Sequence, residues 1–376
     1  MTDLGLSGRA GPDRPKWSLN RLIASPTFQR RMARIPLIRG LVRRDGEEIF
    51  DLVAGFCHSQ MLHALVKFEV LDHLLKGPRT TAELALFCQA PEPRVRIMMD
   101  AAVALGLVRK KKDHYRIARK GAAIVGVPGL KGMIAHHDVL YRDLADPVAF
   151  LRGETEPELA QFWPYVFGAD GASDPETAAT YSKLMTDSQS LVADETLSMI
   201  SLSGVEHLMD IGGGTGAFLA AAAKVNTTMA LTLFDLPAVV PAAKDLAAER
   251  GTTDRLTIVP GSFRDDPLPH GADMISLVRV LYDHADETVA ALLAKAFDTL
   301  PAGGRILISE PMAGGDTPQR AGDAYFALYC LAMNTGKARS ADEIVSLLSQ
   351  AGFEAIQTPH SRRPFVTSVV TAVKPA

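Results

Sequence analysis

The chain has 376 residues, of which 47% are hydrophobic and 22% are charged, and its formal net charge is −3. This length suits two or three domains, and the composition excludes a largely disordered chain and argues against a general nucleic-acid binder. The three cysteines at positions 57, 88 and 330 have no paired spacing, so we expect no metal site and no disulfide framework. There is no run of 18 apolar residues and no secretory signal, so we expect a cytoplasmic protein that does not span a membrane.

Residues 1–46 form a basic arm. Between Asp13 and Asp45 there is no acidic residue, but there are nine arginines and lysines, interleaved with Trp, Phe, Leu, Ile and Met side chains. Pro26 and Pro36 limit any helix here to short pieces. Such an arm predicts a peripheral contact of residues 14–44 with a membrane surface, and a solvated arm or packing within a dimer are the alternatives.

Residues 47–125 begin with a strong helical pattern. Apolar residues recur at helical spacing from Phe50 to Leu75. This spacing predicts one long amphipathic helix, which Gly77 and Pro78 end.

A capping box and a hairpin complete this segment. Thr80 and Glu83 are spaced to begin a second helix, and a third is expected over about 92–105. Two β runs follow, at 107–109 and 114–117, joined by a lysine-rich turn. Three helices followed by a hairpin are typical of a winged helix.

The rest of the chain divides at about residue 200. Residues 126–200 are predicted to be helical, with mixed aromatic and polar side chains, and we assign them to a linker and substrate region. Residues 201–376 alternate β runs with helical segments, which indicates a parallel sheet covered on both faces. The β runs are 207–211, 229–234, 256–259, 274–280 and 305–309. Two last runs, 354–358 and 365–372, have no helix between them, so we expect a hairpin and one antiparallel edge strand.

The strongest local signal is the glycine run Gly212, Gly213, Gly214 and Gly216, directly after a β run and before a helical segment. Glycines permit a tight turn and the close approach of a ligand to the backbone. At the end of the next strand, Asp235 is placed to accept hydrogen bonds from ribose hydroxyls. The spacing satisfies the dinucleotide pattern, so a nicotinamide or flavin cofactor is one interpretation.

Three features favour S-adenosylmethionine instead. Asp210 stands two residues before the first glycine, where it can hold an ammonium group. Gly216 extends the glycine run, and the closing hairpin departs from an all-parallel dinucleotide domain. A glycine turn without any ligand is the remaining alternative.

Together, several short motifs resemble the class I O-methyltransferases typified by the plant caffeic acid enzyme, from about residue 48 to the C-terminus. They are Asp210–Gly216, Phe234–Pro237, Gly261–Phe263, Leu281–His284, Gly303–Arg305 and Ala351–Phe353. Within that group the chain is similar to the bacterial carotenoid hydroxyl methyltransferases, in the segments Phe50–Phe56, Asp143–Pro147, Ser276–Val280 and Gly322–Phe326. The resemblance implies an α/β fold, with a C-terminal doubly wound, Rossmann-like sheet of seven strands and an N-terminal helical, winged-helix domain that forms a homodimer.

The resemblance also implies a cofactor site for S-adenosylmethionine. Asp210 and the glycines at 212, 213 and 214 would contact its methionine part. Asp235 would hold the ribose, with Leu236 and Phe263 beside the adenine. Ser262, where the family often has an acid, and Arg279 complete the expected set.

The expected chemistry is a methyl transfer to a hydroxyl, whose proton must be removed. In the plant-like enzymes a histidine held by acids takes it; here that position is Tyr282, one acid is matched by Glu310, and the other position holds Ala338. Tyrosine is a poor base at neutral pH, and ionising an aliphatic hydroxyl beforehand would cost on the order of 12 kcal/mol at pH 7. We therefore expect the proton to leave as the methyl group arrives. His284, in the loop after the fourth strand, is our first candidate for the acceptor.

The resemblance implies a small apolar substrate, a hydroxylated acyclic carotenoid of the spheroidene or spirilloxanthin type made for photosynthesis. A polyene needs a long apolar tunnel, for which the candidate lining residues are His136, His137, Tyr141, Met185, Tyr325, Phe326 and Met333. The two histidines are also candidate proton acceptors, and packing in the helical core is the alternative for most of the set.

Other functions fit parts of the same pattern. A related methyltransferase would act on a bacteriochlorophyll precursor or a phenolic metabolite. A winged-helix regulator that senses a small ligand would use Lys110–Lys112 on DNA phosphates. Against the regulator, the expected recognition helix carries only Arg94 and Arg96 as basic residues, so we expect no nucleic-acid partner.

Overall fold

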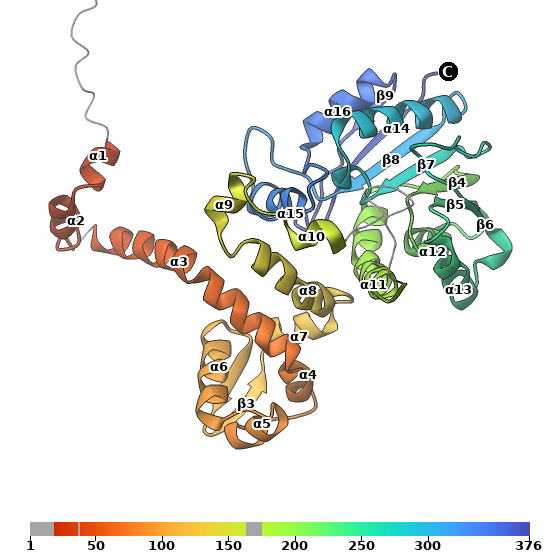
Figure 1. Ribbon diagram of the computed structural model, residues 1–376. Coiled ribbons are helices and arrows are strands. Elements are labelled where there is room, and N and C mark those ends of the chain that lie inside the picture. Colours follow the sequence, from red (N-terminus) through yellow and green to blue (C-terminus); the bar gives the residue numbers. More distant parts are fainter. Residues whose placement is uncertain (1–18, 37, 163–174) are drawn as a thin grey trace, which may run out of the picture. The chain divides into compact units, whose positions relative to one another are not determined.

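The computed structural model describes residues 19–36, 38–162 and 175–376, with backbone only at 161, 162, 175–185 and 187 (Figure 1). The predicted substrate contact of the Met185 side chain therefore lies outside the described residues. The chain divides into two units, one up to Ala64 and one from Leu65 onward.

The first unit is helical. It contains α1 (Leu19–Ile23), α2 (Pro26–Met32) and most of α3 (Arg39–Lys67). The short helices expected around the two prolines are present, but α3 begins before the boundary expected at residue 47. α3 is long and apolar enough to cross a membrane by length and composition, with a hydropathy of 1.3. Only 11% of its most apolar stretch is buried within the described chain.

The expected continuous helix up to Leu75 is wrong, because α3 ends at Lys67 and α4 (Val70–Leu75) follows as a separate helix. The break lies at Glu69, whose φ of 55° is in the left-handed region that a helix cannot continue through. Nothing in the apolar spacing marks this residue, because the same spacing fits one bent or two separate helices.

The next elements form the expected winged helix. They are β1 (Arg79–Thr80), α5 (Thr81–Phe87), α6 (Glu92–Ala104), β2 (Val108–Lys111), β3 (His114–Ile117) and α7 (Arg119–Gly126). The capping box is confirmed: the Glu83 backbone N–H donates to Thr80 Oγ1, and the Thr80 N–H donates to the Glu83 carboxylate. Two details differ, because Lys110 and Lys111 belong to β2 rather than to the turn, and β1 adds an unexpected third strand beside β3.

Helices α8 (Leu130–Asp143), α9 (Pro147–Leu151), α10 (Glu158–Phe162) and α11 (Pro175–Met199) occupy the helical region. α8, α9 and α10 share one apolar cluster with a late segment of the chain, α15 (Ala327–Ala332). The cluster contains Leu140, Phe150, Leu159 and Met333, all buried. This packing brings residues near 140 beside residues near 330, where the structure has its candidate substrate side chains.

The C-terminal domain contains a seven-stranded sheet in the order β6-β5-β4-β7-β8-β10-β9. Its strands are β4 (His207–Ile211), β5 (Ala230–Asp235), β6 (Leu256–Pro260), β7 (Met274–Val278), β8 (Arg305–Glu310), β9 (Glu354–Gln357) and β10 (Ser368–Val373). The hairpin of β9 and β10 is confirmed, but the expectation of an antiparallel edge strand is wrong. β10 is inserted between β8 and β9 and runs antiparallel to both, so the edge strand β9 has the direction of the parallel strands.

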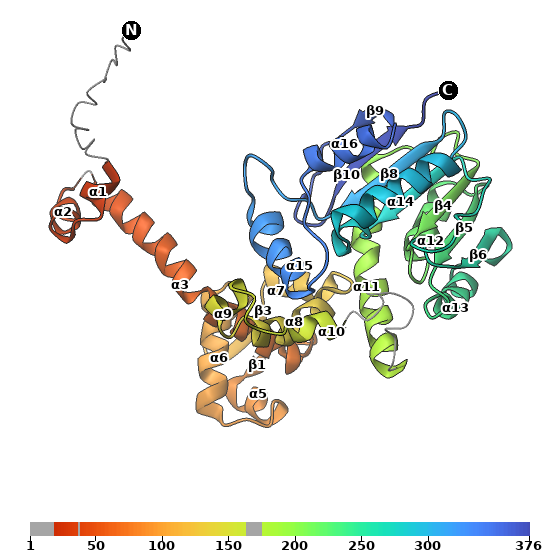
Figure 2. The ribbon, with the colours of Figure 1, turned by 45° about the horizontal axis from the view of Figure 1, so that its top comes forward.

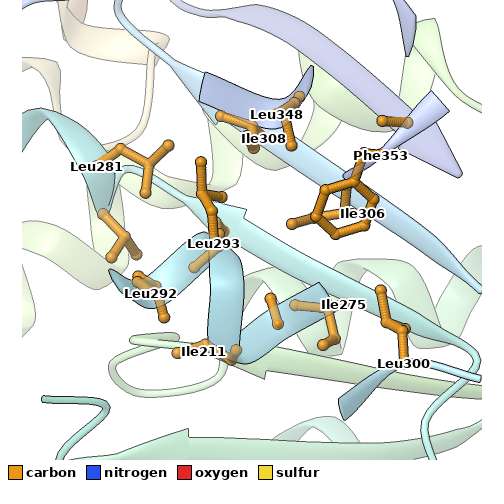
Figure 3. Packing of buried hydrophobic residues seen from close by; sticks show 14 of the residues in the cluster. Ile211, Ile275, Leu281, Leu292, Leu293, Leu300, Ile306, Ile308, Leu348 and Phe353 are labelled. Atoms are coloured by element: carbon orange, nitrogen blue, oxygen red, sulfur yellow. The ribbon is translucent and has the colours of Figure 1, made fainter. Parts of the chain in front are cut away.

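Helices cover both faces of this sheet (Figure 2). α14 (Asp286–Thr299) and α16 (Ala341–Gln350) pack on one face. α11, α12 (Ala217–Val225) and α13 (Val240–Arg250) pack on the other. Strands buried on both sides explain the nearly continuous apolar β runs of the sequence. Figure 3 shows the first of these layers, in which Leu292 and Leu293 of α14 meet Ile275, Ile306 and Ile308 of the strands.

We expect this layer to dominate the stability of the domain. Leu293 is fully buried, so Leu293→Ala should lower the free energy of unfolding by about 2–5 kcal/mol through lost burial and a cavity. Leu151, which is 66% exposed, is the matched control, and Leu151→Ala should change it by less than about 0.5 kcal/mol. Urea unfolding followed by circular dichroism measures both, and equal effects of the two variants would contradict the assigned core.

Candidate active site

A cavity opens at the carboxyl ends of β4, β5 and β7, the edge where ligands bind in open α/β sheets. Most of the predicted cofactor residues lie in its wall. The described residues of the wall are Thr186, Gln189, Gly212–Thr215, Ala217, Asp235, Leu236, Val239, Gly261–Arg264, Val278–Val280, Asp283 and His284.

The glycine loop has almost no room for side chains on its inner side. A Cβ on Gly213 would lie 2.3 Å from Asp210 Oδ2 and 2.6 Å from Leu233 Cδ1. Gly212 has a φ of +67°, and a Cβ there would meet Val280 at 2.9 Å. Gly214, with a φ of +61°, has nothing within 4 Å of a built Cβ, so its bare backbone faces open space. These three positions need glycine for different physical reasons, which are close packing on one side and ligand access on the other.

Asp210 lies beneath this loop and is not part of the cavity wall. Its side chain is only 1% exposed; Oδ1 accepts a 2.6 Å hydrogen bond from Ser276 Oγ, and Oδ2 has no partner among the described residues. Burial, with a smaller contribution from Asp235, raises the pKa of this carboxyl to about 7. A buried acceptor without a partner is costly, so the site is built for a donor or a cation that comes from outside.

Asp235 lies in the wall itself at the end of β5. Its carboxylate accepts hydrogen bonds from the Gly214 N–H at 2.6 Å and from the Leu236 N–H at 2.7 Å. Burial raises its pKa, and the two backbone donors act against that rise. Each carboxylate oxygen keeps a lone pair for another donor, which is what a ribose hydroxyl would need.

Ser262 and Phe263 line the cavity near the end of β6. The Ser262 N–H donates to Asp266 Oδ2 at 2.8 Å, and its hydroxyl donates to Asp265 Oδ2 at 2.9 Å. The carboxylates of Asp265 and Asp266 therefore lie beside Ser262, the position at which the family often has an acid.

The turn after β7 is held by a residue of the neighbouring strand. Glu310, at the end of β8, accepts hydrogen bonds on Oε1 from the backbone N–H groups of Val280 at 2.9 Å and Leu281 at 2.8 Å. Its other oxygen, Oε2, is buried and has no partner in the described part of the chain. Burial raises the pKa of Glu310 to about 7.

Arg279 begins this turn in an unusual conformation. Its φ of 60° is in the left-handed region, which costs a non-glycine residue on the order of 1–3 kcal/mol. The backbone N–H still donates to the Ser309 carbonyl at 2.8 Å, and the guanidinium donates to Ser188 Oγ of α11 at 2.9 Å. Arg279 lines the cavity wall, as expected, but the sequence does not reveal its left-handed conformation.

Tyr282 and His284 are both buried in the same turn. Burial raises the pKa of the Tyr282 phenol further above its ordinary value, so it stays neutral. Burial, Arg264 and Arg339 lower the pKa of His284 to about 4. Arg264 Nη2 lies 3.1 Å from His284 Nδ1, and a guanidinium can only donate, so Nδ1 accepts and the ring proton of the neutral imidazole is on Nε2.

The described substrate candidates gather between α8 and the segment formed by η5 (Arg320–Phe326) and α15, outside the cavity wall. His136 Nε2 lies 3.1 Å from the Tyr329 hydroxyl, and His137 Nε2 lies 2.6 Å from the Tyr325 hydroxyl. Burial lowers the pKa of His136 to about 4 and raises that of Tyr325 to about 12. Tyr141 lies next to His137, Phe326 packs edge-on against Tyr325, and Met333 is buried in the apolar cluster.

Several residues of the wall were not predicted. Asp283 lies inside a motif that the sequence analysis quotes, between two residues that were assigned roles. Arg264 follows Phe263 directly, and its cation was not considered. Thr186 and Gln189 come from α11, where the sequence has no glycine run or other motif that indicates a ligand. In the described residues there is no group of three or more His, Cys, Asp or Glu that could hold a metal ion.

Comparison with known families defines the class of protein. A model of the O-methyltransferase domain matches residues 141–354, and a model of the O-methyltransferase dimerisation domain matches residues 50–123. The chain therefore belongs to the O-methyltransferase family. The dimerisation match supports a homodimer.

The particular relatives narrow the class. Demethylspheroidene O-methyltransferase of Cereibacter sphaeroides is 54% identical over 95% of this chain and 94% of its own length. The protein of that name from Rhodobacter capsulatus is 50% identical over 94% of this chain and 88% of its own. The solved structure of human N-acetylserotonin methyltransferase in complex with S-adenosylmethionine has 25% identity, a TM-score of 0.76 and coverage of 88% of this chain and 98% of that one. The chain is an S-adenosylmethionine-dependent O-methyltransferase, and its α/β fold with a helical dimerisation domain is the one expected.

The residues present suit this cofactor. The unpartnered Asp210 Oδ2 and the Asp235 carboxylate offer acceptors, Gly214 offers bare backbone, and Arg264 and Arg279 offer cations. When bound, S-adenosylmethionine supplies a methyl group on a positively charged sulfur. Its ammonium, carboxylate and hydroxyl groups are the chemical complements of the groups in the wall and of the Asp210 carboxyl beneath it.

The glycine loop provides a direct test of this fit. Gly213→Ala should weaken S-adenosylmethionine binding at least 30-fold (roughly 2 kcal/mol or more), because the new Cβ meets Asp210 and Leu233 and the loop must move. Gly126→Ala is the matched control, since nothing lies within 4 Å of a Cβ there. Calorimetric titration measures both, and unchanged affinity in the Gly213 variant would show that the cofactor does not use this loop.

Proposed function

We propose that this chain transfers a methyl group from S-adenosylmethionine to the hydroxyl of a hydroxylated acyclic carotenoid. The observation that carries the proposal is the 54% identity with demethylspheroidene O-methyltransferase of Cereibacter sphaeroides, which extends over 95% of the chain and so over both domains. At this level of identity, conservation of the overall site is the simplest expectation.

The apolar cluster of α8, α9, α10 and α15 supports a long apolar substrate. Its side chains come from helices that lie far apart in the sequence, and its edge carries the His136–Tyr329 and His137–Tyr325 pairs. Polar pairs beside an apolar surface suit a molecule that is a hydrocarbon with a hydroxyl group. His136, His137, Tyr141, Met185, Tyr325, Phe326 and Met333 are the residues proposed to contact it.

The cofactor contacts follow from the charges in the wall. Asp210 and the loop of Gly212, Gly213 and Gly214 take the methionine part, with Arg279 as a cation for its carboxylate. Asp235 accepts from the ribose. Leu236, Ser262 and Phe263 form the adenine end, where Asp265 and Asp266 are the carboxylates next to the position of the missing acid.

Catalysis in this arrangement depends on position rather than on a strong base. An aliphatic hydroxyl does not ionise first at neutral pH, so the site must align the oxygen with the methyl carbon and take the proton during transfer. Tyr282 is a neutral hydrogen-bond donor that orients the substrate hydroxyl. Glu310 fixes the backbone that carries Tyr282 and His284. His284 could accept the proton only after Arg264 releases Nδ1.

A methyltransferase of a phenolic metabolite or a bacteriochlorophyll precursor is the second candidate, since the same fold and cofactor serve it. The regulator hypothesis has little support from the wing. Lys110, one of its expected phosphate contacts, binds Asp100 at 3.2 Å, and Arg96 of the expected recognition helix binds Glu92 at 2.5 Å, so both are engaged within the domain.

The substrate is tested with the purified chain, methyl-labelled S-adenosylmethionine and a 1-hydroxy acyclic carotenoid in detergent micelles. We expect a labelled methyl ether, identified by mass spectrometry. Caffeic acid replaces the carotenoid in a parallel reaction, and Gly213→Ala controls for label not transferred at this site. Label on the phenol but not on the carotenoid would overturn the proposed substrate.

We also propose that the basic arm brings the enzyme to the surface of an anionic membrane, where a carotenoid resides. Leu19, Leu22 and Ile23 of the arm are exposed, at 65%, 40% and 47%. Arg43 and Arg44 pair with Glu47 and Glu48, whereas the arginines of α1 and α2 have no ion pair in the described residues. Exposed apolar side chains next to unneutralised arginines suit the interface of an anionic bilayer.

Replacing Arg30, Arg31 and Arg34 with Gln should weaken binding to phosphatidylglycerol-containing vesicles roughly 100-fold, at about 1 kcal/mol for each cation near the surface. Co-sedimentation measures the bound fraction. The matched control replaces the exposed arginines 94, 109 and 116 of the winged helix in the same way. Equal losses in both triple variants would mean that the total charge, not the arm, governs binding.

A further inference from the structure

Asp283 is a carboxylic acid in the cavity wall, and its side chain is hydrogen-bonded to Tyr282. It ends η4 (Leu281–Asp283), the short helix after β7. The residue is half-buried and lines the same cavity as the glycine loop, while its Oδ1 atom is buried and has no hydrogen-bond partner among the described residues. A buried acceptor without a partner, on a residue that lines a cavity, is a place for a proton donor from a ligand.

The backbone at Asp283 is clamped, so the carboxyl has little freedom to move away. The Tyr282 carbonyl accepts hydrogen bonds from the Lys337 N–H at 2.9 Å and from Cys330 Sγ at 3.5 Å. Gly336 crosses so closely that a Cβ there would lie 2.0 Å from the Tyr282 oxygen and 2.7 Å from the Asp283 carbonyl carbon. Such packing fixes a functional group in advance.

The charged and titratable groups around Asp283 come from every element packed against it. Burial and the Glu310 carboxyl of β8 raise its pKa well above the ordinary value, and Arg279 and Tyr282 act against that rise. Tyr329 and Cys330 of α15 are neutral neighbours. Lys337 directs its ammonium to Glu343 at 2.6 Å, and Arg339 binds the carbonyls of Leu281 and His284 and the carboxylate of Asp286.

The other candidate acceptors are engaged. Tyr282 is a neutral phenol, and His284 carries its proton on Nε2 because Arg264 occupies Nδ1. Glu310 lies behind the turn and accepts two backbone N–H groups on one oxygen. Asp235 lies at the ribose end and accepts two others. Among the carboxyls of the described wall, Asp283 is the one whose Oδ1 atom accepts no hydrogen bond from the protein.

We propose that the Asp283 carboxylate accepts the proton of the substrate hydroxyl while the methyl group is transferred, an inference that rests on the proposed function. The hydroxyl O–H bond breaks and its proton passes to the carboxylate. The electron pair of that oxygen forms the new bond to the methyl carbon, and the pair of the carbon–sulfur bond stays on sulfur. A sulfonium and a carboxylate become a neutral thioether and a neutral acid, so a buried pair of opposite charges disappears in one step. A cation near the cavity wall also favours the ionised form of Asp283 before transfer.

Turnover gives the first test. Asp283→Asn keeps the size of the side chain but cannot take a proton, so kcat with the hydroxylated carotenoid should fall at least 100-fold, while the Kd of S-adenosylhomocysteine, which has no sulfonium charge, changes less than about threefold. Asp283→Glu should recover part of the rate. Wild-type kcat should fall on the acid side of its pH profile, and the residual rate of the Asn variant should not. The exposed Asp316, replaced by Asn, is the matched control.

A second test needs no turnover. Titration of S-adenosylmethionine and of S-adenosylhomocysteine in two buffers of different ionisation heat counts the protons released on binding. The two ligands differ in the sulfonium charge, so the difference between them reports groups that face the sulfur. At neutral pH the wild type should release more protons on binding S-adenosylmethionine than on binding S-adenosylhomocysteine. This difference in proton release should vanish in Asp283→Asn.

The outcomes are separable. If the wild type makes no methylated carotenoid, the proposed substrate fails, and the proton count still decides the position of Asp283. Unchanged kcat in Asp283→Asn, loss of the acid limb only in His284→Ala, or the same proton difference in wild type and Asn variant would each overturn the assignment of Asp283.

Discussion

One hydrogen-bonded carboxyl supports the arrangement of the whole site. Glu310, at the end of β8, accepts the N–H groups of Val280 and Leu281 across the boundary between two neighbouring strands. The turn fixed in this way carries Arg279, Asp283 and His284 into the cavity wall. Because a buried carboxyl must keep its donors, the parallel pairing of β7 and β8 and the shape of this turn depend on each other.

Charge is concentrated around the cavity in a way that the small net charge of the chain conceals. Asp210, Asp235, Asp283 and Glu310 are acids whose pKa burial raises, and Arg264 and Arg279 are the cations of the wall. Without a ligand, burial of so many carboxyls favours their protonated forms. A ligand with both a cationic and an anionic end pairs with the acids and with the arginines. Binding of such a cofactor therefore offsets the free energy that burying these charged groups costs.

Local sequence signals predicted the local features of this fold. Apolar β runs and turn glycines identified β4 to within a residue at each end, and the spacing of Thr80 and Glu83 fixed a capping box, because both depend on neighbours in the chain. The break at Glu69 and the left-handed Arg279 arise from tertiary packing, which periodicity does not record. The place of β10 inside the sheet likewise depends on which strand edge remains open, not on the hairpin itself.

In the candidate site, too, the sequence indicated features set by neighbours in the chain but not those set by tertiary packing. The position of the glycines and Asp235 in the cavity wall could be predicted because they follow two successive strands, whereas the position of Asp210 below the loop required its contacts with Ser276 and Gly213. Asp283 was quoted as part of a motif and given no role, because an unsatisfied oxygen is visible only when the surrounding atoms are known. His284 could be placed at the right edge of the sheet, but its occupied Nδ1 depends on Arg264, twenty positions earlier.

Because α3 exposes an apolar face, the stability of this enzyme depends on its concentration in the cell. Ile49, Phe50, Leu52, Val53 and Phe56 are each more than 60% exposed within their own chain. If a second copy covers them, association adds to folding by mass action, and each tenfold dilution removes about 1.4 kcal/mol of that contribution. A cell that synthesises little of this chain would then hold a protein that melts, aggregates and is degraded more readily than the same sequence at high copy number.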